Sequence, residues 1–503
     1  MSYSLPKIRI PVSLRRLLPM SSFVGCADVR VTEATDDSRK CTSGVLFAVI
    51  SGSRCDGVRY VGEAAERGAT ALLVERPLPG ISLPQCVVRN VRRAYAELNA
   101  ALQGNPSRQL GVVGITGTNG KSTVCWLIRS ILQAAGRQTG LLGTIEYSDG
   151  LATTESTLTT PDSRTLSAWL AAMVQRGTTH AALELSSHAL DQHRASGTLL
   201  DVAVVTNLTQ DHFDYHGDFA SYRASKQRIL EQVKPGGRVV LNADDPVAAA
   251  FCCHAGSENE IVTYGLEVDA DVSATILEQT GRESRFVLSA DGERVEVCTS
   301  LVGRHNISNC LAAAAATRQF GISLNEIAAG IEALTAVPGR LESIDCGQPF
   351  SVRVDYAHTD DALRRSLRSV RELSSGRVLC VFGAGGDRDR SKRPLLARAA
   401  SEADLAIVTS DNPRTENPER IIQDILGGFD ETSHQPHVEV DRAAAIRWAL
   451  DRAEPGDSVL VAGKGHETEQ ILGEERIPFD DRTVIREFLS QTAQRREPLR
   501  IPA

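Results

Sequence analysis

The sequence lacks the features that would place it in a membrane or on nucleic acid. No stretch of its 503 residues approaches eighteen consecutive apolar side chains, so no segment is expected to span a bilayer. The first twenty residues interleave basic side chains with prolines and hold no continuous apolar run, so a signal peptide is not expected. A net charge of −8 argues against a surface that binds nucleic acid. We therefore expect small-molecule partners.

The cysteines also lack a pattern that would indicate disulfides or a metal centre. There are eleven, and no two of them form a C-x-x-C pair. Cys252-Cys253 is the one adjacent pair, and no histidine cluster at ligand spacing accompanies it. We expect free thiols in a reducing cytoplasm.

The length of the chain exceeds what one hydrophobic core supports, and the pattern of apolar runs predicts three α/β domains. Residues 1–107 are expected to form a small α/β domain, followed by a linker at 103–108. Residues 108–338 are expected to form a central, P-loop-type domain with a mostly parallel sheet, and 339–503 a Rossmann-like α/β domain. The expected strands are Gly111–Ile115, His180–Leu185, Val202–Asn207, Arg238–Asn242, Ser351–Val354, Val378–Phe382, Leu405–Val408 and Ser458–Val461. A small antiparallel annex is expected between about 260 and 300.

The segment Gly111–Thr123 carries the strongest functional signal. A β-branched run leads into a glycine-rich turn and then into Lys121, Ser122 and Thr123 at the start of an expected helix, 121–135. Such a turn presents backbone N–H groups to phosphate, the lysine supplies positive charge and the hydroxyls can hold Mg²⁺. The glycines at 114, 117 and 120 do not match the common G-x-x-x-x-G-K-[ST] spacing, and a tight turn with a surface lysine is the alternative. The order of these features favours a nucleoside triphosphate.

Polar residues follow two further expected strands of the central domain. One strand ends at Glu184 and the next is followed by Asp211, His212, Asp214 and His216. Ligands gather at the carboxyl ends of parallel strands, so Glu184 and His212 are candidates for holding the divalent ion of ATP. A hydrogen-bonded loop histidine is the alternative, because Mg²⁺ prefers oxygen ligands.

These segments resemble the motifs of one family, the Mur ligases of peptidoglycan synthesis. Residues 114–123 are similar to the family's G-x-T-G-T-N-G-K-[ST]-T loop, and 184–194 to its E-x-S-S-x-x-L-x-x-x-R segment. Residues 206–216 resemble T-N-L-x-x-D-H-L-D-Y-H, with Phe213 in place of Leu, and 303–309 resemble the element that holds adenine. The resemblance implies ATP contacts from Gly117, Thr118, Asn119, Gly120, Lys121, Ser122, Thr123, Asn306, Arg340 and Asp355.

The resemblance also implies the remaining parts of an amide-ligase site. Lys121, His212 and Lys226 are the implied catalytic residues, with Lys226 carbamylated, and the implied Mg²⁺ site comprises Ser122, Thr123, Glu184, His212 and carbamylated Lys226. The resemblance implies that the UDP part of a UDP-linked substrate is held by Ser38, Ser53, Arg54 and Cys55. The muramoyl-dipeptide part of the same substrate is expected at Thr159, Thr160, Ser186, Gln192 and Arg194. The chain departs from the family at Ser122 for Thr, Ser225 for Ala and Asp360 for Pro.

Within the family, Asp411-Asn-Pro-Arg414 resembles the motif of members that add meso-diaminopimelate. An arginine can bind the second carboxylate of that substrate with two hydrogen bonds and repels the ammonium of lysine. The implied contacts are Arg388, Asp411, Asn412, Pro413, Arg414, Gly463 and Glu467. We expect a cytoplasmic, monomeric ligase that uses ATP and Mg²⁺. The alternatives are a lysine-adding ligase, a relative such as a folylpolyglutamate synthase, and a nucleotide-dependent switch.

Overall fold

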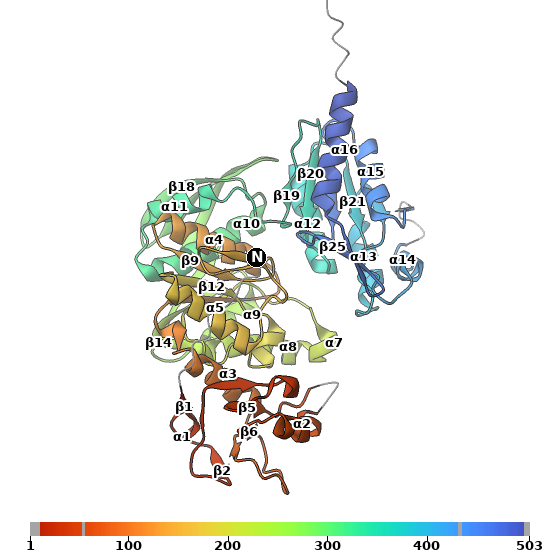
Figure 1. Ribbon diagram of the computed structural model, residues 1–503. Helices are drawn as coiled ribbons and strands as arrows, with labels where there is room; N and C mark the ends of the chain where they lie inside the picture. The colour runs from red at the N-terminus through yellow and green to blue at the C-terminus, as the bar shows by residue number, and fades with distance from the viewer. Residues whose placement is uncertain (1–10, 53–55, 431–434, 497–503) are drawn as a thin grey trace, which may run out of the picture. The chain divides into compact units, whose positions relative to one another are not determined.

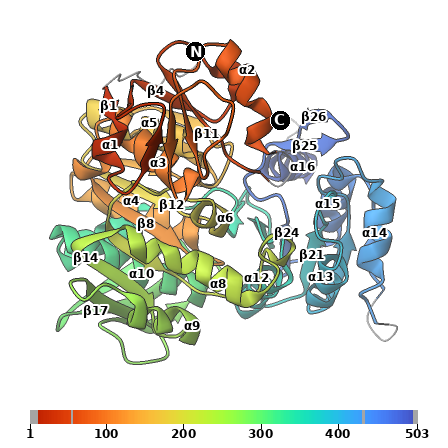
Figure 2. The same ribbon diagram turned by 90° about the horizontal axis from the view of Figure 1, so that it is seen from below.

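The computed structural model describes residues 11–52, 56–430 and 435–496, and it has three main β-sheets (Figure 1 and, from below, Figure 2). Contacts divide these residues into two compact units. The first holds the described residues up to Ser273 together with Ser289–Val295 and Asn309–Ile331, and the second holds Ala274–Leu288, Glu296–Ser308 and the described residues from Glu332 onward. The predicted three-domain α/β architecture is confirmed at the level of fold class.

A five-stranded sheet occupies the N-terminal part of the first unit. Its order is β2(Ser22–Val24)-β7(Gln85–Val87)-β6(Ala71–Val74)-β5(Val45–Ala48)-β4(Glu33–Thr35), parallel except for β2. Helices α2(Val61–Glu66) and α3(Val91–Leu102) accompany it, and α3 begins where the Asn90 side chain accepts a hydrogen bond from the Arg93 amide. Strands β1(Val12–Ser13) and β3(Arg30–Val31) form a two-stranded sheet, and α1(Leu14–Leu17) directly follows β1.

The central sheet has eleven strands, and its middle positions the phosphate loop. The order is β11(Thr153–Glu155)-β10(Glu146–Ser148)-β9(Thr139–Leu142)-β12(His180–Glu184)-β8(Gly111–Thr116)-β13(Leu200–Val205)-β14(Val233–Asn242)-β15(Glu260–Gly265)-β16(Val272–Gln279)-β17(Ser284–Ala290)-β18(Glu293–Thr299). Six consecutive pairs, from β9–β12 to β15–β16, are parallel. The four predicted strands of this region match β12, β8, β13 and β14 to within a few residues at their ends. Strands β12 and β13 flank β8, so their carboxyl ends lie beside the loop that follows β8.

The expected separate annex between 260 and 300 is wrong in part. Strands β15 and β16 continue the parallel sheet, so an antiparallel region does not begin near residue 260. A hairpin does follow, because β17 and β18 are joined by Asp291 and Gly292 alone, both at positive φ (51° and 78°). That is the conformation of a two-residue hairpin turn.

Helices cover the central sheet, and the first of them carries the phosphate-loop lysine. They are α4(Lys121–Ala134), α5(Ser163–Gln175), α6(Ser187–Asp191), α7(Phe213–His216), α8(Phe219–Gln227), α9(Pro246–Ala249), α10(Arg304–Thr317) and α11(Leu324–Ala333). The predicted helix 121–135 is confirmed with its end one residue earlier. The apolar run at 311–316 is fully buried within α10, as a packing helix requires. No helix among the described residues combines the length and apolar character that crossing a bilayer requires.

The second unit holds a six-stranded sheet with helices on both faces. Its order is β19(Glu342–Ser343)-β20(Ser351–Asp355)-β24(Ser458–Ala462)-β21(Val378–Phe382)-β22(Leu405–Val408)-β23(His437–Val438), parallel except for β19. One core cluster packs α12(Asp360–Leu373), α13(Lys392–Ala400) and α14(Pro418–Leu426) on one face, and a second packs α15(Arg442–Arg452) and α16(Asp481–Arg496) on the other. A hairpin, β25(Glu469–Leu472) with β26(Glu475–Pro478), follows β24.

Asp360, which stands where the resembled family has proline, fits the local structure. Asp360 is the first residue of α12, directly after Thr359, whose hydroxyl oxygen accepts a hydrogen bond from the Ala362 amide. Proline and acidic residues both suit this first helical position, since its N–H has no intrahelical partner. The helix therefore starts in the ordinary way without the proline.

Candidate functional site

The loop after β8 adopts a conformation that only glycine permits at two positions. Gly117 and Gly120 have φ of 147° and 87°, and a Cβ at these positions would lie 1.8 Å from Thr206 Oγ1 and 2.4 Å from Asn309 Oδ1, respectively. Helix α4 then begins at Lys121. The loop thus brings backbone amides and a helix N-terminus to one place, as phosphate binding requires.

The end of β13 holds this loop in shape. Thr206 Oγ1 donates a hydrogen bond to the Asn119 carbonyl at 2.6 Å, and Asn207 Nδ2 donates to the same oxygen at 3.1 Å. In return the Asn119 amide donates to Asn207 Oδ1 at 3.0 Å, and the Thr118 amide donates to the Asn207 carbonyl at 2.8 Å. The sequence pattern contained Thr206 and Asn207 without giving them a role; the structure shows that they support the phosphate loop.

Two lysines meet at one carbonyl of the loop. Lys121 Nζ donates to the carbonyls of Gly117 and Thr118 at 2.9 and 2.8 Å, and Lys226 Nζ, from α8, donates to the Gly117 carbonyl at 2.6 Å. Lys226 is 2% exposed. Burial, reinforced by the positive charge of Lys121, holds the pKa of Lys226 well below its usual range. Burial and the neighbouring lysine thus both disfavour the charged form of Lys226.

A buried carboxylate lies against the first turn of α4. Ser122 Oγ donates to Glu184 Oε2 at 3.0 Å, while the Thr144 amide and hydroxyl donate to Glu184 Oε1 and Oε2 at 2.9 and 3.0 Å. Gly143 makes room for this carboxylate, because a Cβ there would lie 2.1 Å from Glu184 Oε1. Thr144 had no motif signal, since a lone threonine in a loop is unremarkable in sequence.

The oxygen donors at this place suit Mg²⁺. Ser122 and Glu184 are in contact, and Thr123 is buried beside them on the same helical turn. Among the described residues no three His, Cys, Asp or Glu side chains converge as a metal centre. Mg²⁺ keeps several waters and takes few protein ligands when it is bound with nucleotide phosphates. This donor set therefore fits a magnesium ion that is completed by phosphate and water.

His212 belongs to a group of aromatic side chains. It has a left-handed backbone (φ 55°), and its Nε2 lies 3.3 Å from Asp211 Oδ2. Its ring centroid is 4.7 Å from that of His188, which in turn is 4.2 Å from Tyr215 and 5.6 Å from His216. The His212 side chain thus lies beside those of Asp211 and His188. Its place among the Mg²⁺ ligands stays a prediction.

The residues expected to hold the muramoyl-dipeptide gather around Glu184. Thr160 Oγ1 donates to the Glu184 carbonyl at 2.7 Å and accepts from the Ser186 amide at 3.0 Å. Arg194 Nη1 donates to the Thr160 carbonyl at 3.1 Å, and Arg194 Nη2 donates to Gln192 Oε1 at 2.8 Å. The hydroxyls of Thr159 and Thr144 are hydrogen-bonded at 3.1 Å, and Thr144 also contacts the Glu184 carboxylate. The predicted dipeptide residues and the predicted Mg²⁺ ligand are thus neighbours.

The expected UDP contacts lie in the N-terminal sheet or outside the described residues. Ser38 is 6% exposed, and its hydroxyl donates to Glu63 Oε2 at 2.6 Å. It belongs to the turn Ser38–Lys40, which the Asp37 side chain caps. Ser53, Arg54 and Cys55 lie outside the described residues.

Three of the expected ATP contacts belong to the second unit. Asn306 Nδ2 donates to the Val302 carbonyl at 2.8 Å within the start of α10. Asp355 ends β20, where its carboxylate accepts from the Leu341 and Ala357 amides at 2.6 and 2.8 Å; burial raises its pKa despite these bonds and the nearby Arg340. The Arg340 guanidinium lies 4.7 Å from the centroid of the Tyr356 ring. Their contact with a nucleotide stays a prediction.

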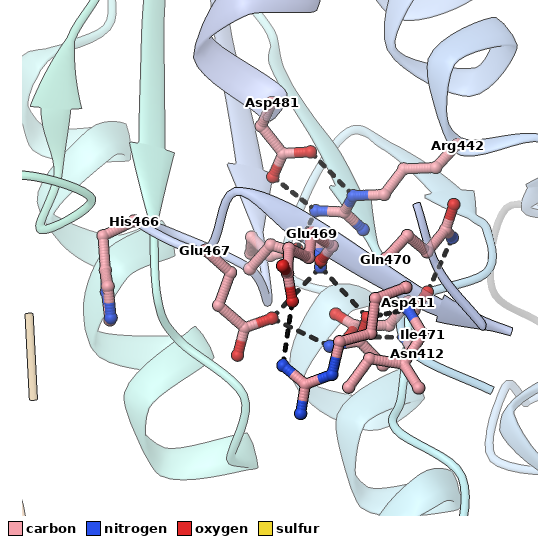
Figure 3. A network of polar contacts seen from close by, with 12 residues as sticks. Asp411, Asn412, Arg442, His466, Glu467, Glu469, Gln470, Ile471 and Asp481 are labelled. Carbon is pink, nitrogen blue, oxygen red and sulfur yellow. Dashed lines mark hydrogen bonds and ion pairs between the residues drawn. The ribbon is translucent and has the colours of Figure 1, made fainter. Parts of the chain in front are cut away.

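The carboxyl end of the six-stranded sheet brings the remaining predicted residues together. Asp411 and Asn412 follow β22, and Gly463 and Glu467 follow β24. Asn412 Nδ2 donates to Glu467 Oε2 at 2.8 Å (Figure 3). A Cβ on Gly463 would lie 2.6 Å from Asp411 Oδ2, so glycine is required for this close approach. Sequence spacing alone could not have shown that these two loops touch.

The two arginines of the predicted diaminopimelate site lie on adjoining loops. Arg414 has φ of 52° and is half-buried, and its Nη1 donates to the Gly386 carbonyl at 2.7 Å. Arg388, two residues after Gly386, is exposed. Burial and the charge of Arg388 lower the pKa of Arg414, while nearby carboxylates oppose that shift. Buried Pro413 sits before Arg414, and its carbonyl would lie 1.9 Å from a Cβ on Gly386. Two cations therefore share one small region.

The site also contains a buried lysine that sequence reasoning missed. Lys464 has no exposed surface and donates to Asn412 Oδ1, Glu467 Oε2 and the Glu469 carbonyl at 3.1, 3.1 and 2.6 Å. In the same network, Arg442 and Asp481 form a fully buried ion pair, with two hydrogen bonds of 2.8 and 2.7 Å (Figure 3). A lysine between two glycines reads as a solvated loop residue, so no signal in the sequence pointed to it.

Comparison with known proteins gives matches along the chain. Three sequence families match: the Mur ligase family, catalytic domain over residues 30–105, the Mur ligase middle domain over 115–317, and the Mur ligase, glutamate ligase domain over 339–465. A UDP-N-acetylmuramoyl-L-alanyl-D-glutamate--2,6-diaminopimelate ligase of Solibacter usitatus is 43% identical over 467 residues, which are 92% of this chain and 94% of the relative. One of the same name from Geobacillus kaustophilus is 45% identical over 460 residues, 90% and 93% of the two chains.

Solved structures agree with these sequence matches. A structure of a UDP-N-acetylmuramoyl-L-alanyl-D-glutamate--2,6-diaminopimelate ligase superposes with a TM-score of 0.69 and 31% identity, covering 96% of this chain and all of the other. MurF from Acinetobacter baumannii shares the fold, with a TM-score of 0.62 at 20% identity, 96% of this chain and all of that one being covered. The family matches and relatives of over 40% identity across nine-tenths of the sequence show that the chain belongs to the Mur ligase family.

Proposed function

We propose that this Mur ligase adds meso-diaminopimelate to UDP-N-acetylmuramoyl-L-alanyl-D-glutamate, using ATP and Mg²⁺, in the cytoplasm and as a monomer. The observation that carries the substrate assignment is the pair Arg388 and Arg414, on loops that adjoin through the Arg414–Gly386 hydrogen bond. The relatives of 43% and 45% identity bear the name of a diaminopimelate ligase, which supports the same substrate.

The chemistry needs an activated carboxylate, because hydroxide is a poor leaving group and a carboxylate repels nucleophiles. In the proposed route, the γ-carboxylate of D-glutamate attacks the γ-phosphorus of ATP, giving an acyl phosphate and ADP. The amine of diaminopimelate then attacks the acyl carbon, and inorganic phosphate and one proton leave. Phosphoryl transfer of this kind depends on alignment and charge neutralisation.

The residues of the first unit are assigned to that phosphoryl transfer. Lys121 neutralises phosphate charge; its ammonium already lies against the loop carbonyls and needs only a rotation of its side chain to meet a ligand. Mg²⁺, when bound by Ser122, Thr123 and Glu184, supplies charge neutralisation of the phosphates. Thr160, Ser186, Gln192 and Arg194 hold the dipeptide close to Glu184, which supports transfer between the two substrates.

Carbamylation of Lys226 is part of the proposal. A neutral lysine amine attacks CO₂ and loses one proton, and this replaces a potential cation with an anion. The buried amine of Lys226 has the depressed pKa that this reaction needs. An anion at this position would stabilise the charge of Lys121, with which Lys226 shares the Gly117 carbonyl. His212 is assigned to the side of the site where the carbamate of Lys226 and the Mg²⁺ ion would lie.

Specificity is assigned to the second unit. Arg388 and Arg414 are placed to bind the distal carboxylate of diaminopimelate, since a guanidinium holds a carboxylate through two parallel hydrogen bonds. Asp411 and Glu467 supply negative charge for the distal ammonium, and Asn412, Pro413 and Gly463 shape the pocket between them. Lysine carries no carboxylate at that end, so two unmatched arginines disfavour it.

The test is the dependence of phosphate release on each substrate. We expect release from ATP when both the UDP-dipeptide and meso-diaminopimelate are present, and a product heavier by one diaminopimelate less water. Phosphate release that does not depend on either substrate would indicate a nucleotide-dependent switch. Phosphate release that lysine supports in place of diaminopimelate would be consistent with a ligase but would contradict the proposed amino-acid substrate.

A further inference from the structure

Lys464 joins three of the residues labelled in Figure 3, Asn412, Glu467 and Glu469. Its ammonium donates to one acceptor on each of three segments: Asn412 after β22, Glu467 after β24 and the carbonyl of Glu469 at the start of β25. A fully buried lysine with this set of acceptors loses most of its rotamer freedom. The three segments are therefore tied together at one atom.

The network fixes the orientation of Asn412. Its Oδ1 accepts from Lys464 Nζ and from the Ile471 amide at 3.1 and 3.0 Å, so its Nδ2 is left to donate to Glu467. A flipped amide would point its NH₂ group at two donors, which is unfavourable. Lys464 thus decides which way the Asn412 side chain faces.

The same contacts fix one oxygen of Glu467 and leave the other available. Oε2 accepts from both Asn412 and Lys464. Among the described residues no hydrogen bond to Oε1 is found, and the side chain is 32% exposed. A carboxylate held by one oxygen presents the other in a defined direction, as a group that receives a ligand ammonium should.

The charges agree with that role. Arg442 and Asp481 neutralise each other in a fully buried pair. Lys464 is then the cation in direct contact with Glu467, while Arg388 and Arg414 of the same region are assigned to the distal carboxylate of the substrate. Without Lys464, Glu467 would lose the charged contact that orients it, next to the buried carboxylate of Asp411.

We infer that Lys464 is a specificity-determining positioning residue: it does not touch the amino-acid substrate but sets the direction in which Glu467 and Asn412 present themselves to the substrate's ammonium. The inference deepens the proposed function and rests on it.

The test is a double-mutant cycle with Lys464→Met, Glu467→Gln and the double variant, in the full-length protein. We expect Lys464→Met to raise the KM for meso-diaminopimelate about 10-fold to 100-fold, with the KM values for ATP and the UDP-dipeptide changed less than about 3-fold. In the Glu467→Gln background the same substitution should add less than about 3-fold, because it acts through Glu467. Multiplicative effects, or equal increases in all three KM values, would overturn the inference.

A matched control and a folding check complete the design. Lys234→Met serves as the control, because Lys234 also contacts a carboxylate (Asp201, 2.7 Å) and a backbone carbonyl, that of Leu110. Lys234 belongs to the first unit and is distant in sequence from Lys464. Its replacement should leave the KM for diaminopimelate unchanged. If Lys464→Met does not melt cooperatively, Lys464→Gln replaces it. Failure of both variants to fold would make Lys464 structural and refute the inference. Wild-type enzyme that ligates no diaminopimelate would instead refute the proposed function.

Discussion

Replacement of Arg414 by alanine tests the substrate assignment with a magnitude that follows from the structure. Alanine keeps the Cβ, so the backbone strain at φ 52° is unchanged and only the guanidinium is lost. Of its five N–H donors, one on Nη1 is given to the Gly386 carbonyl, while Nε and Nη2 donate no hydrogen bond to any of the described residues. These are the donors available to a carboxylate.

Truncating one partner of a buried charged pair costs about 2–5 kcal/mol, and because Arg414 is half-buried we expect the lower part, about 2–3 kcal/mol. At a factor of ten per about 1.4 kcal/mol, kcat/KM for meso-diaminopimelate should fall about 30-fold to 150-fold. The loss should be confined to that substrate, since ATP and the UDP-dipeptide are assigned to other residues.

Steady-state kinetics with each amino acid decide the matter. Lysine, which lacks the distal carboxylate, should be used no worse by Arg414→Ala than by the wild type. Arg414→Lys serves as the matched variant: it keeps the charge but loses the planar fork, so it should recover only part of the activity with diaminopimelate. A proportional loss for both amino acids would refute the reasoning and make Arg414 a support of the loop through Gly386.

Three further substitutions test the first unit. Lys121→Ala should lower turnover by at least ~10²-fold with UDP-dipeptide affinity unchanged, measured by calorimetry; near-normal turnover would remove the phosphate-loop assignment. Lys226→Ala should be nearly inactive and partly recovered by acetate or formate, and full activity without an added anion would show that no carbamate is needed. Gly143→Ala should displace the Glu184 carboxylate from Ser122, because the new Cβ would lie 2.1 Å from Oε1, and should raise the Mg²⁺ concentration needed for half-maximal rate; an unchanged Mg²⁺ dependence would contradict the metal assignment.

The buried amine of Lys226 also gives a pH dependence with a definite sign. The folded pKa is depressed, so between that value and the ordinary lysine pKa near 10.4 the unfolded chain binds more protons than the native one. The unfolding free energy of CO₂-free protein should therefore rise with pH across that window. Lys226→Met should flatten this rise in denaturant titrations, whereas an identical slope in the variant would show that Lys226 is not the titrating group.

The sequence predicts features whose residues are contiguous far better than features assembled from separate loops. The turn 111–123 could be read directly, because strand, glycines, lysine and hydroxyls follow one another. For Glu184 and Ser122, the sequence could predict only that both lie near the carboxyl ends of neighbouring strands. Their 3.0 Å hydrogen bond could be seen only in the structure. Thr144, which donates twice to Glu184, lies on a third loop and has no pattern of its own.

Lys464 and the strand β15 show two physical reasons for the remaining misses. A lysine flanked by glycines is solvated in most proteins, and only the approach of the 411–414 loop and β25 buries this one. Strand β15 is less covered than the central strands, with Glu260 and Ile261 exposed, yet it pairs in parallel with β14. The exposure of a strand depends on how its faces are covered, and it does not give the direction of the neighbouring strand.

A competition experiment tests the central claim most directly. The enzyme is given ATP, Mg²⁺, the UDP-dipeptide and equal concentrations of meso-diaminopimelate, lysine and ornithine, and the products are weighed by mass spectrometry. The account predicts a UDP-tripeptide that carries diaminopimelate almost exclusively, formed in equal amount with the phosphate released. A lysine or ornithine product of comparable yield would contradict it.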